Sequence, residues 1–269
     1  MLSLSDRVVL LTGAAGGIGR CLARTLSAQG ARLALVDRDA EGLRSVVAEL
    51  SGPASAHIAD LSQTGGFDDL VAQVVAQHGR IDVLICNAGL TIHAPFSAMR
   101  LDEIDRVMDV DLRGVLHLVH HCLPHLRASD DAHIVLISSM AGLQAFPFQS
   151  IYSAAKHGLR GYGEALRMEL GAVGIGVTTV LPGTIATGFM DDAGDHSPER
   201  LAQLASLMKR FGTSPQRVAT KTVRGVLRNH GRVRVGWDCY TVSFVQWIAP
   251  PVLPLLLAWS ARRELMGSK

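Results

Sequence analysis

The stretch Arg7-Val8-Val9-Leu10-Leu11-Thr12-Gly13-Ala14-Ala15-Gly16-Gly17-Ile18-Gly19 decides the fold of this chain. Its first six residues form an apolar, β-branched run of strand length, and the glycines that follow predict a tight turn. After the turn, apolar residues recur at helical spacing up to Gly30. Strand, glycine-rich turn and helix in this order predict a phosphate-binding site, because glycines let the backbone approach a pyrophosphate and a helix N-terminus attracts negative charge.

A second strand-like run favours a dinucleotide as the ligand. Residues 31–36 are mostly apolar and lead into Asp37, eighteen residues after Gly19. An acidic side chain there can accept hydrogen bonds from the adenosine ribose and repels a 2′-phosphate, which favours NAD over NADP. Arg38 follows and could bind a 2′-phosphate, so NADP remains the second choice. Without Asp37, a tight turn that binds nothing would explain the glycines equally well.

The rest of the chain continues the alternation of strands and helices. Further strand-like runs cover residues 54–59, 81–86, 133–137, 176–181 and 232–235. This alternation predicts an α/β fold with a doubly wound, Rossmann-type parallel sheet and helices on both faces, in a single domain. We assign residues 1–236 to the dinucleotide-binding and catalytic part and 237–269 to an apolar extension of the same domain. The carboxyl ends of the strands should form the site.

Three residues of one segment have the chemistry of an acid–base catalyst. Tyr152 and Lys156 are four residues apart, so on a helix they share a face. A nearby ammonium favours the phenolate form of a tyrosine, whose pKa is ordinarily about 10. Ser139 lies thirteen residues before the tyrosine and could hold the oxygen that gains or loses the proton. A helix-surface Tyr–Lys pair without catalytic function is the alternative.

Six motifs in order resemble those of the short-chain dehydrogenase/reductase family, over residues 5–236. They are Thr12 to Gly19, Asp60-Leu61, Asn87-Ala88-Gly89, Ser138-Ser139-Met140-Ala141-Gly142, Tyr152-Ser153-Ala154-Ala155-Lys156, and Pro182-Gly183-Thr184 with Thr187. The resemblance implies that Ser139, Tyr152 and Lys156 are catalytic and that Lys156 also binds the nicotinamide ribose. It implies that Asp60 contacts adenine, that residues 87–89 support the sheet beside the cofactor, and that residues 182–187 line the nicotinamide. The expected cofactor contacts are Gly13, Ala15, Gly17, Ile18, Gly19, Asp37, Arg38, Asp60, Leu61, Asn87, Ala88, Gly89, Tyr152, Lys156, Pro182, Gly183, Thr184 and Thr187.

The expected reaction is hydride transfer between a nicotinamide cofactor and a secondary alcohol or ketone, with Tyr152 as acid and base. This makes the protein an NAD(P)-dependent alcohol dehydrogenase or carbonyl reductase. The alternative is a non-catalytic dinucleotide-binding sensor or scaffold, including one at a membrane surface. The presence of both Tyr152 and Lys156 favours the enzyme.

One position departs from the family pattern. The chain has Asp111 where the family usually has an asparagine that supports a water and proton path to the lysine. A carboxylate near Lys156 would strengthen the ammonium but would also add negative charge near a phenolate, and these effects on Tyr152 oppose each other. We predict retained activity with an altered pH optimum.

The segments expected around the substrate are rich in Leu, Met and Phe. They are residues 90–99, 140–148 and a stretch of about 185–212 that resembles the family's mobile lid. Few charged groups there could bind a phosphate or carboxylate, so we expect an apolar alcohol or ketone of steroid, retinoid or lipid type. Ordinary packing would also explain these apolar residues.

Composition limits the remaining function classes. The formal net charge is +2, which gives no strong attraction to nucleic acid. The four cysteines are scattered without a Cys-x-x-Cys pair, and no apolar signal core precedes the first strand, so we expect a cytoplasmic protein. His117, His120, His121 and His125 recur at helical spacing. We expect no metal there but a subunit interface, since the family resemblance implies a homodimer or homotetramer.

The C-terminal stretch is unusual because residues 239–261 carry no formal charge and prolines interrupt them. We favour packing against the substrate pocket or a partner subunit. A helix lying at a membrane surface and a membrane-spanning segment are the alternatives, the last weakened by Pro250, Pro251 and Pro254. A protein that stays in the supernatant without detergent would contradict both membrane alternatives.

Overall fold

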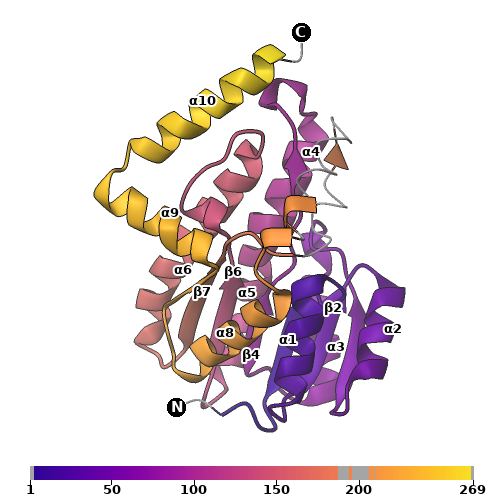
Figure 1. The fold of residues 1–269 in the computed structure, drawn as a ribbon. Helices are drawn as coiled ribbons and strands as arrows, with labels where there is room; N and C mark the ends of the chain where they lie inside the picture. Colours follow the sequence, from indigo (N-terminus) through magenta and orange to yellow (C-terminus); the bar gives the residue numbers. More distant parts are fainter. Residues whose placement is uncertain (1–2, 187–193, 196–205, 209, 268–269) are drawn as a thin grey trace.

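The computed structural model describes residues 3–186, 194–195, 206–208 and 210–267. Strands and helices alternate along the chain (Figure 1). The main elements are β1 (Val8–Thr12), α1 (Gly17–Ser27), β2 (Arg32–Asp37), α2 (Ala40–Glu49), β3 (Ala54–Ile58), α3 (Phe67–His78), β4 (Val83–Cys86), α4 (Leu101–Met108), α5 (Gly114–Arg127), β6 (His133–Ile137), α6 (Ser150–Gly171), β7 (Gly176–Pro182), α8 (Pro215–Leu227), β9 (Arg232–Val235), α9 (Trp237–Ile248) and α10 (Val252–Gly267). A short parallel pair joins β5 (Ile92–His93) to β8 (Gly194–Asp195).

Seven strands form one parallel sheet in the order β3-β2-β1-β4-β6-β7-β9. The strand order reverses between β1 and β4, and such a switch point opens a crevice at the carboxyl ends of the strands. The predicted doubly wound, Rossmann-type fold is therefore confirmed. The predicted strands agree with the observed ones to within two residues at either end.

Helices cover both faces of the sheet and form two apolar cores. On one face, Leu22 of α1 and Val218 of α8 are buried against the strands, in a cluster that α2 also joins. On the other face, Leu118 of α5 and Leu159 of α6 are buried together with apolar residues of α3. Because both faces are covered, β1, β4 and β6 are buried along their whole length.

A π-helical turn, η3 (Asp109–Arg113), joins α4 to α5. Such a turn inserts an extra residue into a helix and often occurs at a functional site. Here it contains Asp111, which is fully buried although it is charged. The turn therefore brings a carboxylate into the interior beside α6.

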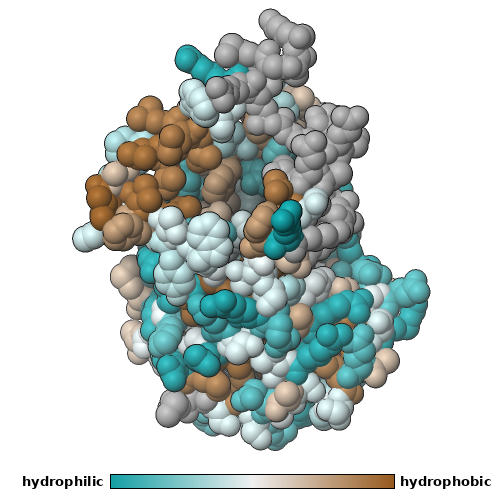
Figure 2. Space-filling model, in the orientation of Figure 1, coloured by the Kyte–Doolittle hydropathy of each residue, from teal (hydrophilic) through white to brown (hydrophobic). Residues whose placement is uncertain are grey.

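The chain ends in α9 and α10, which we call the C-terminal arm. Its first helix is anchored, since Cys239 in the first turn of α9 is buried against Leu143 and Leu181, and the Gln246 amide in the last turn donates to the Leu143 carbonyl at 2.7 Å. Beyond this contact the arm stands out from the body (Figure 1), and its surface is strongly apolar (Figure 2). Among the described residues, no single helix has the length and hydropathy to cross a bilayer, and α9 with α10 meet both conditions only as a pair bent by 115°.

Candidate active site

A cavity of about 840 Å³ lies at the carboxyl ends of the strands. Nearly all of the predicted site residues line it: Gly13, Ala15, Gly17, Ile18, Gly19, Asp37, Arg38, Asp60, Leu61, Asn87, Ala88, Gly89, Ser139, Tyr152, Lys156, Pro182, Gly183 and Thr184. Asp111 lies behind Lys156 rather than on the cavity wall. Thr187 and most of the predicted lid lie outside the described residues.

The glycine turn forms one end of the cavity. Gly13 has φ +64°, and a Cβ there would lie 2.7 Å from the Ala88 Cα, so only glycine fits. The Asn87 amide donates to the carbonyls of Thr12 and Gly13, at 3.0 Å each, and ties the end of β4 to this turn. The turn leads directly into the N-terminus of α1, which is the arrangement that a pyrophosphate needs.

Asp37 lies at the end of β2 beside the same turn. Its Oδ2 accepts a hydrogen bond from the Ala15 N–H at 2.9 Å, and its Oδ1 accepts one from the Asp39 N–H at 3.1 Å. These bonds fix the carboxylate at the cavity wall, where Arg38 and Asp60 also lie. One end of the cavity thus holds a glycine turn, a helix N-terminus and a fixed carboxylate. This combination fits the adenosine half of a dinucleotide.

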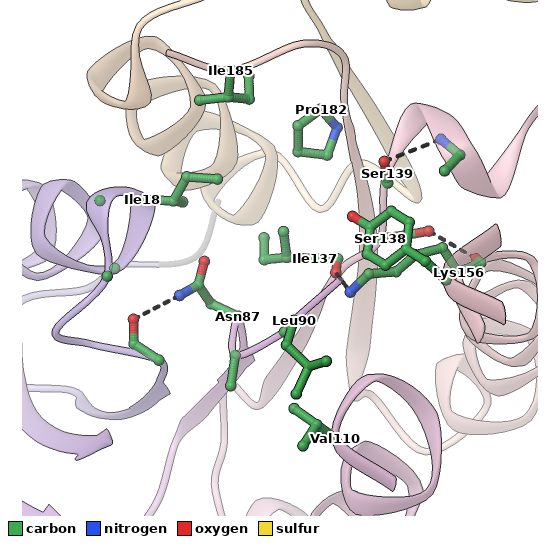
Figure 3. A pocket seen from close by; sticks show the side chains of 18 of the residues that line it. Ile18, Asn87, Leu90, Val110, Ile137, Ser138, Ser139, Lys156, Pro182 and Ile185 are labelled. Atoms are coloured by element: carbon green, nitrogen blue, oxygen red, sulfur yellow. Dashed lines mark hydrogen bonds between the residues drawn. The ribbon is translucent and has the colours of Figure 1, made fainter. Parts of the chain in front are cut away.

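The opposite side of the cavity holds the three residues that are predicted to be catalytic. Tyr152 and Lys156 are in the first two turns of α6, and Ser139 follows β6. Figure 3 shows Ser139 and Lys156 across the cavity from Asn87 and Ile18. The Lys156 Nζ lies 5.5 Å from the centre of the Tyr152 ring and donates to the Ile137 carbonyl at 3.3 Å.

A comparison with protein families decides to which family the chain belongs. The model of the short chain dehydrogenases matches residues 7–198, which is most of the chain. The chain belongs to the short-chain dehydrogenase family. It is therefore an oxidoreductase of that type, and the expected resemblance is confirmed.

Known relatives cover almost all of this short-chain dehydrogenase. The dehydrogenase/reductase SDR family member 7B of Xenopus tropicalis is 32% identical, in a match that covers 97% of this chain and 87% of that one. A metagenomic short-chain oxidoreductase solved in complex with NADP is 31% identical, with a TM-score of 0.70 over 87% of this chain and all of that one. A short chain dehydrogenase/reductase from Burkholderia phymatum, solved in complex with NAD, shares the fold with a TM-score of 0.82 at 24% identity, over 87% of this chain and 90% of that one.

The pKa of Tyr152 in this dehydrogenase is raised above its ordinary value. Burial of the phenol in the cavity wall is the largest cause, and Lys156 opposes it. Asp111 raises the pKa again, and a hydrogen bond with Ser139 lowers it. Lys156 thus acts on Tyr152 in the predicted direction, but burial outweighs it.

Asp111 and Lys156 form a buried ion pair with 3.1 Å between Oδ2 and Nζ. Burial disfavours the charge of Lys156, but Asp111 and then Tyr152 outweigh burial and raise its pKa. The other oxygen of Asp111 accepts from the Leu90 N–H at 2.7 Å. The pair is close-packed, since a Cβ on Gly89 would lie 3.2 Å from the Lys156 Nζ. Lys156 therefore stays charged and is held in place.

Asp111→Asn is expected to move the pH profile of alcohol oxidation to lower pH. Oxidation requires the phenolate, so kcat/KM rises with pH through the pKa of Tyr152. Removing the Asp111 charge lowers the pKa of Tyr152, because that carboxylate raises it. The measurement is kcat/KM for oxidation between pH 6 and 10. Asp109→Asn is the matched control, since Asp109 is in the same turn but pairs with Arg113. Superimposable profiles for wild type and Asp111→Asn would contradict this role.

His93 and Phe148 lie in the segments 90–99 and 140–148 that were expected around the substrate, and they line the cavity with their ring centres 5.6 Å apart. Two other residues escaped prediction. Ser260 of α10 lines the cavity from the far end of the chain. Asp238 lies outside the lining, but its Oδ2 accepts from the Thr184 N–H at 2.5 Å and holds the loop after β7. Neither Ser260 nor Asp238 belongs to a recognisable motif, and chain folding alone brings them to the site.

The histidines that recur on α5 lie away from the cavity. The His121 Nδ1 lies 2.7 Å from an oxygen of Asp68 on α3, and His120 and His121 form an edge-to-face pair. In the part of the chain that the structure describes, no group of three His, Cys, Asp or Glu side chains is placed to bind a metal ion.

Proposed function

We propose that this short-chain dehydrogenase transfers a hydride between NAD and an apolar secondary alcohol or ketone, with Tyr152 as the acid and base. The observation that carries the proposal is one cavity that contains both the glycine turn with Asp37 and the group of Ser139, Tyr152 and Lys156. Such a cavity brings a dinucleotide and an acid–base residue within reach of one substrate carbon.

Each residue of the site would have its own role in the proposed hydride transfer. In oxidation, the Tyr152 phenolate takes the proton of the substrate hydroxyl, while the Ser139 hydroxyl donates a hydrogen bond to the same oxygen. A nicotinamide bound in the cavity would supply the acceptor for the hydride of the carbinol carbon. Lys156 keeps positive charge beside the phenolate and would bind the nicotinamide ribose. In reduction, the Tyr152 hydroxyl returns its proton to the carbonyl oxygen.

The substrate side of the cavity favours an apolar molecule. Its walls include Leu90, Met140, Phe146, Phe148 and Met208. We would assay a panel of secondary alcohols, from short water-soluble ones to steroid, retinoid and long-chain alcohols, with NAD and NADP, by the absorbance of the reduced cofactor. The proposal expects turnover with NAD that improves with apolar size. Cofactor binding without turnover of any alcohol or ketone would instead indicate the non-catalytic sensor or scaffold.

Replacing Asp37 tests the cofactor preference. Asp37→Ser is expected to lower kcat/KM with NAD by roughly 10- to 100-fold, because hydrogen bonds of a charged group to the adenosine ribose are lost. Activity with NADP should be maintained or rise, since Arg38 remains and the repulsion of a 2′-phosphate is removed. Glu41→Gln is the control because this exposed residue in the first turn of α2 changes the net charge equally. A wild-type enzyme that prefers NADP would refute the assignment to NAD.

The oligomeric state of this enzyme is also part of the proposal. We expect a homodimer or homotetramer that associates through α5 and α6. Sedimentation velocity measures the state directly, and a monomer at all concentrations would contradict it.

A further inference from the structure

The C-terminal arm exposes its largest apolar side chains. Trp247 is 80% exposed, Leu255 68% and Leu256 59%, and Phe244 and Ile248 are similar. Of residues 252–262 of α10, whose exposure the structure describes, only Leu253, Leu257 and Ala261 are half-buried; they are spaced by four and therefore mark the side that faces the body. The rest of the helix circumference up to Trp259 is apolar and exposed. A helix that is apolar all round is normally covered by protein or lipid.

The arm also forms part of the mouth of the active-site cavity. Ser260 of α10 lines the cavity, as does Met208 of the segment 206–208. Close to Met208, Leu207 and Phe211 are 54% and 62% exposed. Exposed apolar side chains in two separate parts of the chain are thus close in sequence to residues that line the cavity. Figure 2 shows the apolar surface of the arm as a continuous patch beside this region.

We propose that the C-terminal arm docks on the surface of an anionic lipid bilayer and opens the active-site cavity toward the lipid, so that apolar substrates enter from the membrane. The docking itself is independent of catalysis. The entry of the substrate rests on the proposed function. Neither helix of the arm spans a bilayer alone, and their bend of 115° suits a pair that lies along the interface instead.

The residue types of the arm favour lipid, rather than a second copy of the chain, as the partner that covers its apolar surface. All three tryptophans of the protein are in the arm, at Trp237, Trp247 and Trp259, and are 71%, 80% and 57% exposed. Tryptophan and tyrosine concentrate at membrane interfaces because their rings combine an apolar body with a polar group. A two-fold contact would cover one face of a helix, whereas α10 exposes apolar residues on every side except the one facing the body.

The charges around the arm match an anionic surface. The single carboxylate between Trp237 and Arg262 is Asp238, and it accepts hydrogen bonds from the Thr184 and Cys239 N–H groups. Arg262 is exposed directly after the apolar stretch, and the Lys221 Nζ lies 5.3 Å from the centre of the Tyr240 ring. Cations at the edge of an apolar helical surface add attraction to anionic lipids.

The arrangement of the tryptophans allows a direct test on the wild-type chain. Vesicles of phosphatidylcholine with and without phosphatidylglycerol would be titrated into the protein, and tryptophan emission would report only on the arm. Docking predicts a blue shift, quenching by brominated lipids, and co-flotation that is stronger with the anionic vesicles. Unchanged emission without flotation on either vesicle would overturn the proposal.

A matched pair of variants assigns the binding to the arm. Trp247→Gln with Leu255→Gln is expected to reduce partitioning into vesicles by at least roughly tenfold. Met168→Gln with Val173→Gln removes side chains of similar exposure, 76% and 57%, near the far end of α6 from Tyr152, and should bind vesicles like wild type. Retained NAD binding and an unchanged melting temperature show that each variant is folded. Equal flotation of both variants would overturn the assignment of vesicle binding to the arm. If the arm variant does not fold, quenching of the wild-type tryptophans by brominated lipids decides whether the arm binds the vesicles.

Two further measurements separate the competing outcomes. If wild type does not float and the arm variant lowers the association state in sedimentation velocity, the arm is an interface between two copies and the proposal fails. Turnover of the panel of alcohols and ketones tests the proposed function without vesicles. Flotation without turnover therefore overturns the enzyme and leaves the docking, whereas turnover without flotation does the reverse.

Discussion

Tyr152→Phe is expected to lower kcat for alcohol oxidation and ketone reduction by roughly 10²–10⁴-fold. The substitution removes only the phenol oxygen, which is the proposed proton donor and acceptor, and leaves the ring that lines the cavity. NAD binding, measured by titration calorimetry, should remain within about threefold of wild type. A tenfold loss of affinity would correspond to about 1.4 kcal/mol. Single-turnover measurements locate the loss in the chemical step.

The position of Tyr162 offers a control for this substitution. Tyr162 is a second tyrosine on α6, partly buried in the core behind the sheet and not on the cavity wall. Tyr162→Phe should keep kcat near that of wild type. Loss of activity in both variants, or in neither, would contradict the assignment of Tyr152 as the acid and base.

Lys156→Met is expected to reduce the free energy of unfolding by about 3–5 kcal/mol near pH 8, as well as abolishing activity. The substitution leaves the Asp111 carboxylate buried without its cation. Burial already raises the pKa of Asp111, and Lys156 is the main group that opposes this shift. In the variant the penalty should be largest at high pH. It should shrink as the pH falls toward the ordinary pKa of an aspartate, about 3.9, because the buried carboxyl becomes neutral.

The double variant Asp111→Asn with Lys156→Met separates stability from catalysis. It should recover most of the lost stability in urea unfolding, since neither charge remains, but it should stay inactive because the ammonium beside Tyr152 is still missing. If Lys156→Met is as stable as wild type at pH 8, the ion pair does not contribute as the geometry indicates. Recovery of activity in the double variant would contradict the role of Lys156.

The sheet and the cofactor end of the cavity could be predicted because their signals are local. The run of residues 7–12 is apolar as it must be for a strand buried on both faces, and Gly13 has the positive φ that its turn requires. Asp37 could be placed because the end of β2 lies next to the end of β1 in any fold of this type. Each of these features depends on short stretches of chain and on one rule of topology.

The remaining features depend on contacts between distant segments. Asp238 meets Thr184 across 54 residues and Ser260 reaches the cavity from α10, and no spacing in the sequence predicts either. The direction of the Tyr152 pKa could not be predicted because helical spacing reports a neighbouring charge but not burial, and burial is the larger cause. Asp111 could be recognised as unusual, but its contact with Lys156 requires the π-helical turn.

The hydrogen bond between Asp238 and Thr184 connects the C-terminal arm to the loop after β7. Asp238 is in the first turn of α9, two residues after Gly236 with φ +103°, so a rotation of the arm at this glycine would be expected to shift the backbone that follows Pro182. Such coupling is reciprocal. If binding to a lipid surface changes the affinity of the protein for its cofactor by some factor, then cofactor binding changes the affinity for that surface by the same factor. An enzyme built in this way would bind the membrane with an affinity that depends on whether its nucleotide site is occupied.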